Sequence, residues 1–362
     1  MTVYFPLAVA KPADDRIENA LSSYLAQESD ICGQIDPRII QLAGSLSFRS
    51  NGFPYACLTQ HNLGYYLDSQ QENRAVWYMD SIGKLDAPTT EILKDALRIL
   101  QQANAQTAGV GGGVSGLVHG LYCALNAVKV LPKPSAQSPV YTLEIGPGSG
   151  WTTYFLTRFG YHTATIDSSP NLIIVQRYLM EQLPKECSGH YQQILWWDFY
   201  DITQSAPHKF NMIIANHMIC EILQWSRLYI AKWATLNLIE NGSLYFQAWG
   251  DETFHSRYET LLDFKQHGIE QYARNDDQRF PEIALLKKIQ EQVAPLSRAF
   301  TAQRKLLRIF PKLPKFLPTK HLEYFENYQL QSGVSVHETV RAMGFNEGSF
   351  TNSTFLYSGI CT

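Results

Sequence analysis

The stretch "LEIGPGSGW", Leu143 to Trp151, decides the fold of this 362-residue chain. Three glycines stand at alternate positions, Gly146, Gly148 and Gly150, and Glu144 comes two positions before the first of them. The β-rich run "VYTLEI" precedes this loop, and "GWTTYFLTRFG", which suits a helix stopped by a glycine, follows it. Glycine accepts positive φ and lets a ligand touch the backbone, so the stretch predicts a strand, a ligand-binding loop and a helix.

The same alternation continues along the chain. Strands are predicted at "YHTATID" (161–167), "QQILWWD" (192–198), "FNMIIAN" (210–216) and "SLYFQAW" (243–249), and helices at "NLIIVQRYLMEQL" (171–183) and "CEILQWSRLYIAKWATLNLIE" (220–240), the second ended by Asn241-Gly242. Alternating strands and helices predict an α/β fold with a Rossmann-like, doubly wound and mostly parallel sheet. In such sheets, ligands bind beyond the carboxyl ends of the strands.

The flanking regions have a different texture. Residues 13–130 are predicted to be mainly helical, with helices at 89–105 and 117–130, and "PKPSAQSP" (132–139) is typical of a linker. After the fifth predicted strand, helices are expected at 252–268 and 281–293 and a hairpin at 348–359. We therefore expect a helical N-terminal lobe, residues 1–138, that covers the ligand site. A second domain, residues 139–362, follows, with a helical, basic insertion around 252–322.

Composition narrows the functional class. Hydrophobic residues make up 45% and charged residues 17% of the chain, and the net charge of −3 gives no general attraction to nucleic acid. The six cysteines are far apart without a CxxC pair, which favours reduced thiols. No apolar run is long enough for a membrane span, and the N-terminus lacks the basic start of a signal peptide. These features predict a cytoplasmic protein without nucleic-acid partners or membrane insertion, and they leave a homo-oligomer open.

The glycine loop fits neither common phosphate-binding pattern. No GK[ST] follows it, and Trp151 stands where the dinucleotide pattern GxGxxG expects its last glycine. Glu144 would repel a phosphate, but it suits a ligand that carries an ammonium and a sulfonium.

Acidic residues follow the next two strands. Asp167 ends the second predicted strand, 23 residues after Glu144, where a carboxylate can accept from both hydroxyls of a ribose. Asp198 and Phe199 end the third, where they can accept from an adenine amino group and pack against its ring. Together with the loop, these residues predict a site for an adenosine-containing ligand.

The motifs "LEIGPGSG", "ATIDSSP", "LWWDF" and "FNMIIANHMICEI" resemble, in order and spacing, those of class I S-adenosylmethionine-dependent methyltransferases, over about 110 residues. The pattern is also similar to that of bacterial sugar O-methyltransferases. The resemblance implies that the loop holds the methionine part of the cofactor, Asp167 the ribose and Asp198 with Phe199 the adenine. It implies a cofactor site made of Glu144, Gly146, Pro147, Gly148, Gly150, Asp167, Ser168, Asp198, Phe199 and Asn216.

The segment "ANHMICEI" after the fourth strand carries the candidates for catalysis. His217 and Glu221 are four positions apart, so on a helical turn they would share one face. A histidine is a common base near neutral pH, and Glu221 could orient it, accept from a substrate hydroxyl or hold a cation. The alternative is that His217 caps a helix and Glu221 is solvated. The position reads "NHMI" rather than (D/N)PPY, which favours oxygen over nitrogen as the acceptor atom.

Two further features have open interpretations. Asp251, Glu252 and His255 could bind a divalent metal with Glu221, but a solvated helix start is the simpler interpretation, so no metal is predicted. Residues 292–322 hold seven basic residues and no acidic one. This segment could bind an anionic acceptor or a membrane surface, but a solvated face or an oligomer contact is favoured.

The sequence thus predicts a methyltransferase that uses S-adenosylmethionine to methylate a hydroxyl of a small molecule, such as a sugar. Two alternatives remain: a cofactor-binding scaffold without transfer activity, and an oxidoreductase that uses NAD. Asp167 does not separate these cofactors, because both contain ribose, whereas Glu144 and Trp151 disfavour NAD.

Overall fold

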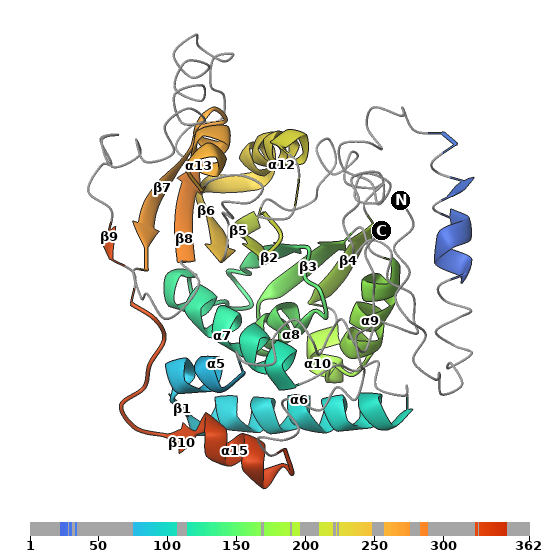
Figure 1. The fold of residues 1–362 in the computed structure, drawn as a ribbon, viewed down its shortest axis with the longest axis vertical. Helices are drawn as coiled ribbons and strands as arrows, with labels where there is room; N and C mark the ends of the chain where they lie inside the picture. The colour runs from blue at the N-terminus through green and yellow to red at the C-terminus, as the bar shows by residue number, and fades with distance from the viewer. Residues whose placement is uncertain are drawn as a thin grey trace, which may run out of the picture. The chain divides into compact units, whose positions relative to one another are not determined.

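The computed structural model describes residues 22–27, 29–30, 33–34, 75–106, 114–167, 170–188, 190–195, 210–219, 222, 224–247, 257–275, 283–288, 323–324 and 326–345 (Figure 1). The chain divides into two compact units, each assembled from separate stretches of sequence. Unit 1 comprises residues 1–135, 147–197 and 327–362, and unit 2 comprises residues 136–146 and 198–326.

Unit 1 combines helices from both ends of the chain with a parallel strand pair. Its helices are α5 (Ala75–Ile82), α6 (Ala87–Gln106), α7 (Val114–Val130), α8 (Trp151–Arg158), α9 (Pro170–Glu181), α10 (Lys185–Ser188) and α15 (Val336–Ala342). Its strands are β1 (Lys84–Leu85), β3 (His162–Asp167), β4 (Tyr191–Leu195) and β10 (Val334–Ser335). β3 pairs with β4 in parallel, and β1 pairs with β10 antiparallel, so the C-terminal helix α15 packs beside α5 and α6 (Figure 1).

Unit 2 is built around a mixed set of strands. Its strands are β2 (Tyr141–Ile145), β5 (Phe210–Asn216), β6 (Leu238–Gln247), β7 (Ile269–Arg274), β8 (Ile283–Lys288) and β9 (Glu323–Tyr324), and its helices are α12 (Gln224–Asn237) and α13 (Arg257–Lys265). β5 lies between β2 and β6 with both pairs parallel, whereas β8 lies between β6 and β7 with both pairs antiparallel. A short parallel pair joins β9 to β7.

These pairs confirm the predicted fold class, an α/β fold with a mostly parallel, Rossmann-like sheet flanked by helices. The sequence of β5 shows why this sheet is flanked by helices. Its residues from Met212 to Ala215 are consecutive and fully buried, as in a strand covered on both faces. The strand bounds predicted there, 210–216, are those of β5.

A tight helix contact fixes the start of α8. A Cβ atom on Gly120 of α7 would lie 2.5 Å from Cβ of Trp151 and 2.7 Å from the backbone nitrogen of Thr152. Only glycine therefore lets the backbone of α7 approach the first turn of α8 this closely. The Trp151 ring is buried with those of Tyr154 and Phe155, 5.5 and 6.3 Å away between centroids, so it belongs to the core of unit 1.

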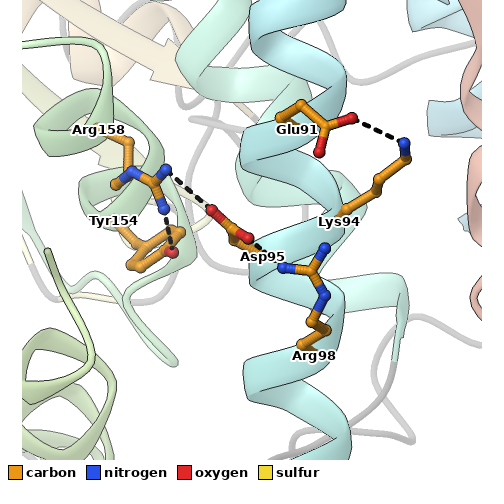
Figure 2. Close-up of polar contacts among 6 residues, drawn as sticks. All are labelled: Glu91, Lys94, Asp95, Arg98, Tyr154 and Arg158. Atoms are coloured by element: carbon orange, nitrogen blue, oxygen red, sulfur yellow. Dashed lines mark hydrogen bonds and ion pairs between the residues drawn. The ribbon is translucent and has the colours of Figure 1, made fainter.

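Polar contacts join the other end of α8 to α6 (Figure 2). Arg158 donates to the Asp95 carboxylate and to the Tyr154 hydroxyl, each at 3.0 Å. Burial raises the pKa of the Tyr154 hydroxyl, and the nearby Arg158 charge opposes that rise. Asp95 also accepts from Arg98 on its own helix. Because Asp95 is partly exposed, the ion pair between Arg158 and Asp95 orients α8 and α6 more than it stabilises them.

The long helix predicted over 220–240 is only partly correct. Helix α12 begins at Gln224, and it ends at Asn237 rather than at Glu240. Leu238 is already part of β6: it is fully buried, pairs with Phe210, and its carbonyl accepts from the Lys288 ammonium at 3.1 Å. Tertiary pairing therefore ends the helix one turn early, and the predicted Asn-Gly turn falls inside β6.

The helix predicted over 281–293 is wrong, because residues 283–288 form strand β8. Ala284, Leu285 and Leu286 are buried in succession, so their apolar run is that of a strand covered on both faces. Strand β7, residues 269–274, was not predicted at all. The helix expected over 252–268 is present as α13 from Arg257, while the hairpin expected at 348–359 lies outside the described residues.

Candidate functional site

The glycine loop connects β2 to α8, as predicted. All three of its glycines have positive φ, at 65° for Gly146, 57° for Gly148 and 86° for Gly150. The Gly150 amide donates to the Pro147 carbonyl at 2.9 Å and closes the turn. Gly150 is also the N-cap residue of α8, and no side chain caps that helix. The loop thus presents backbone rather than side chains at the carboxyl end of β2.

The three glycines are required for different reasons. A Cβ atom on Gly146 would lie 2.7 Å from Cγ of Met218, and one on Gly150 would lie 3.1 Å from Cγ of Gln176. A Cβ atom on Gly148 would meet no described atom within 4 Å. Met218 therefore leaves no room for a side chain at Gly146, and Gln176 crowds one at Gly150. Beside Gly148, the described residues leave open space that a ligand could fill.

Asp167 lies at the carboxyl end of β3, as the sequence predicted. It is 9% exposed, and the Gln176 side chain donates to its Oδ2 atom at 3.1 Å. The same Gln176 nitrogen donates to the Gly148 carbonyl at 2.8 Å. Within unit 1, a single buried side chain thus links the predicted ribose acid to the open part of the glycine loop.

Unit 2 brings together a second group of predicted residues. Glu144 is buried on β2, in register with Ile214 of β5. Asn216 ends β5 in register with Gln247 of β6. Asn216 is nine-tenths buried, and neither polar atom of its side-chain amide has a partner among the described residues. An unpaired buried amide costs about 1–3 kcal/mol, which marks Asn216 as a residue that a bound molecule could satisfy.

His217 follows Asn216 in the left-handed region, with φ at 56°. Its backbone N–H donates to the Gln247 carbonyl at 2.8 Å, which holds the residue in place. A side chain in this conformation costs about 1–3 kcal/mol, and such strain concentrates at functional sites. The helical turn on which we paired His217 with Glu221 is absent at His217, which is a bend immediately after β5.

A buried ion pair lies next to Ile222, which follows His217 in the chain. Arg227 of α12 donates to the Asp263 carboxylate of α13 at 3.1 Å and to the Ile222 carbonyl at 3.2 Å. Burial lowers the pKa of Arg227 to about 10, against the opposing effect of the Glu259 charge. The guanidinium therefore stays charged at neutral pH, and Asp263 balances a charge that would be costly to leave alone.

Several predicted residues lie outside the described part of the chain. They are Ser168, Asp198, Phe199 and Glu221, with Asp251, Glu252 and His255 of the metal alternative and the whole of the basic segment 292–322. Among the residues that are described, His, Cys, Asp and Glu side chains form no group of three that could hold a metal. No helix in the same part of the chain is both apolar enough and long enough to cross a membrane.

Sequence reasoning missed Met218, Gln176 and Gln247. A glutamine within the apolar run of α9, "NLIIVQRYLM", is the one sequence signal that could have drawn attention to Gln176. The other two contribute through a close approach to Gly146 and through pairing with Asn216, which depend on contacts between distant segments.

Comparison with known proteins gives remote structural likenesses. No family model and no curated protein matches the chain. The CcbJ methyltransferase from Streptomyces caelestis is similar over 47% of this chain and 90% of its own, with 14% identity and a TM-score of 0.39. The glycopeptide N-methyltransferase MtfA in complex with S-adenosyl-L-homocysteine is similar over 47% and 87%, with 10% identity and a TM-score of 0.39.

A TehB-like S-adenosylmethionine-dependent methyltransferase from Corynebacterium glutamicum is similar over 54% of this chain and 98% of its own, with 14% identity and a TM-score of 0.37.

Proposed function

We propose that this chain is a methyltransferase that uses S-adenosyl-L-methionine to methylate a hydroxyl group of a small molecule, with a sugar as the favoured acceptor. The observation that carries the proposal is the open face of Gly148, at the carboxyl end of β2, linked through Gln176 to the buried Asp167 carboxylate. This arrangement is what an adenosine-containing ligand needs: backbone that can be approached closely and an acid that can accept from ribose hydroxyls.

The buried Glu144 favours this cofactor over NAD. A carboxylate before the loop attracts an ammonium or sulfonium, whereas it repels a pyrophosphate. Asp198, Phe199 and Ser168 are assigned to the adenosine part by the sequence motifs. Gly146, Pro147, Gly150 and Asn216 complete the proposed set. The buried amide of Asn216 supplies a donor and an acceptor for a polar group of the cofactor or acceptor.

When bound, S-adenosylmethionine supplies a methyl group that is already activated on a sulfonium. The chain's own task is then to orient the acceptor and to remove its proton. We assign proton removal to His217, the residue directly after β5. Its left-handed backbone sets the direction in which the side chain leaves the chain. Glu221 is proposed to orient that imidazole or to contact the acceptor. The segment "NHMI" supports oxygen as the acceptor atom, because it lacks the pattern typical of nitrogen methylation.

We extend the proposal to the parts of the chain outside the cofactor site. Residues 1–138 are proposed to cover the acceptor site, and the chain is proposed to act in the cytoplasm on a small molecule. The basic segment 292–322 is proposed to be a solvated face or an oligomer contact.

Calorimetry with three ligands tests the cofactor assignment. We expect the purified chain to bind S-adenosylmethionine and S-adenosylhomocysteine and to bind NAD far more weakly. Binding of NAD alone would replace the proposal with the oxidoreductase alternative. Binding of the two sulfur ligands without methyl transfer to any member of a sugar, phenol and amine panel would favour the scaffold. Methylated amines without methylated alcohols would correct the acceptor atom.

A further inference from the structure

Gln176 has an unusual position for a polar residue. It lies in the middle of α9, is fully buried, and its side-chain nitrogen donates to both the Gly148 carbonyl and the Asp167 carboxylate. A primary amide has two N–H groups, so these two hydrogen bonds use its whole donor capacity. Gln176 therefore serves two separate parts of the proposed cofactor site at the same time.

A chain of hydrogen bonds fixes which way the Gln176 amide points. Arg177 can only donate, and it donates to the side-chain oxygen of Gln193 on β4. The Gln193 nitrogen is thereby turned toward the Ile173 carbonyl, at 3.2 Å, and toward the Gln176 oxygen, at 3.4 Å. With its oxygen engaged on that side, Gln176 must present its nitrogen to Gly148 and Asp167.

The glycine loop makes room for this arrangement. The Gln176 stem would lie 3.1 Å from a Cβ atom on Gly150, closer than nearly all such contacts, and Met180 would lie 3.5 Å from the same atom. The positive φ of Gly150, 86°, adds strain for any other residue. The missing side chain of Gly150 thus leaves room for Gln176, whereas no described atom lies within 4 Å of a Cβ atom on Gly148.

We propose that Gln176 is a positioning residue that locks the Gly148 carbonyl and the Asp167 carboxylate into one rigid arrangement, so that the loop and the ribose acid bind the cofactor as a unit. This inference rests on the proposed function for its ligand. A hydrogen bond to a carboxylate is stronger than one between neutral groups, so the Asp167 contact carries the larger part of the effect.

The main test is calorimetric titration of S-adenosylhomocysteine into Gln176→Met, which keeps the length and burial of the side chain but removes its donors. We expect affinity to fall by about 10- to 100-fold, the range for a lost hydrogen bond to a charged group. In an Asp167→Asn background, the same substitution should cost less than about threefold, because the charged partner is gone. Gln266→Met, which changes a buried glutamine in the turn directly after α13, is the matched control and should leave affinity unchanged.

A pH profile separates positioning from simple packing. In Gln176→Glu two carboxyl groups would face each other, and the new side chain can donate only when it is protonated. We expect its affinity for S-adenosylhomocysteine to rise at least about fivefold between about pH 8 and pH 6, relative to the wild-type protein. A merely structural substitution gives no such recovery at lower pH.

Hydrogen exchange provides a readout that needs no ligand. In Gln176→Met, the Gly150 amide, which donates to Pro147 within the loop, should exchange about tenfold faster than in the wild-type protein. Normal exchange there together with unchanged affinity would overturn the positioning role. Equal costs of Gln176→Met with and without Asp167 would overturn it as well. If the wild-type protein binds neither S-adenosylmethionine nor S-adenosylhomocysteine, the proposed function is wrong. Faster exchange of the Gly150 amide in Gln176→Met would still support the positioning role of Gln176.

Discussion

Gly148 and Gly160 allow a test of ligand binding against backbone strain. Both have positive φ, and a Cβ atom on Gly160 would make only an ordinary contact, 3.6 Å from Pro134. Alanine at either position should cost about 1–2 kcal/mol of stability from the left-handed backbone. Only Gly148→Ala should also weaken S-adenosylhomocysteine binding, and Gly148→Val should weaken it by about 100-fold or more.

Calorimetry and thermal unfolding of the three variants check this expectation. A folded Gly148→Val protein with wild-type affinity would show that the open face of the loop holds no ligand.

His217→Asn is the sharpest test of the proposed base. Asparagine tolerates the left-handed backbone at this position, so the variant should fold, while it lacks an imidazole. We expect kcat to fall by about 10²–10⁴-fold, the usual effect of losing a positioned base, with cofactor affinity little changed. The wild-type rate should also decline in acid, because a protonated imidazole cannot take up the proton of the acceptor.

The control is Asn241→Ala, which changes the other described non-glycine residue with positive φ, at 61°. It should lower stability without an effect on kcat. Near-normal turnover in His217→Asn with an identified acceptor would place the base elsewhere, with Asp251 or His255 as the next candidates.

Helix α7 offers a matched pair of glycines one turn apart. Gly120→Ala should destabilise the protein, by about 1–3 kcal/mol, because its methyl group would overlap the first turn of α8. Gly116→Ala should stabilise it by up to about 1 kcal/mol, because the new methyl group would lie 3.6 Å from Ser149 and alanine favours the helix. Urea unfolding of both variants decides the matter, and equal effects would contradict the close contact between α7 and α8.

The turn between α13 and β7 should make the stability of the protein sensitive to acid. Burial lowers the pKa of His267, and the Lys232 charge lowers it further. The folded state therefore prefers the neutral imidazole. As the pH falls below the ordinary histidine value of about 6.5, the unfolded chain gains a proton first, and stability is lost until the folded pKa has also been passed.

His267→Gln should consequently lose less stability than the wild-type protein between about pH 7 and pH 5. Urea unfolding at both pH values measures the difference. Parallel losses in the two proteins would show that the His267 side chain does not contribute to acid sensitivity.

Across the whole molecule, local patterns predicted the elements whose environment is uniform along the chain. β5 is covered on both faces and helix α6 has a regular apolar face, so both could be read from spacing alone. A similar apolar run at 281–293 led to a wrong prediction of a helix, because a buried strand and a buried helix share an apolar composition. The end of α12 was missed since it depends on the pairing of Leu238 with Phe210.

The residues of the candidate site also fall into two groups, those that the sequence pattern predicts and those that depend on contacts between distant segments. The positions of residues next to strand ends, such as Gly148 and Asp167, could be predicted from the order and direction of the strands alone. Gln176 was not, because its role depends on partners on two other segments. The separate reasons for Gly146 and Gly150 were equally hidden, since they concern what each glycine makes room for.

The pairing of β1 with β10 has a consequence for how the protein is made. Lys84 and Ser335 are partners in that pair, although they lie 251 positions apart in the chain. At about 5–20 residues per second, the ribosome needs roughly 13–50 s to supply the second strand after the first. The N-terminal helices of unit 1 therefore leave the ribosome long before α15 can cover them, and during synthesis their apolar faces are a natural target for chaperones.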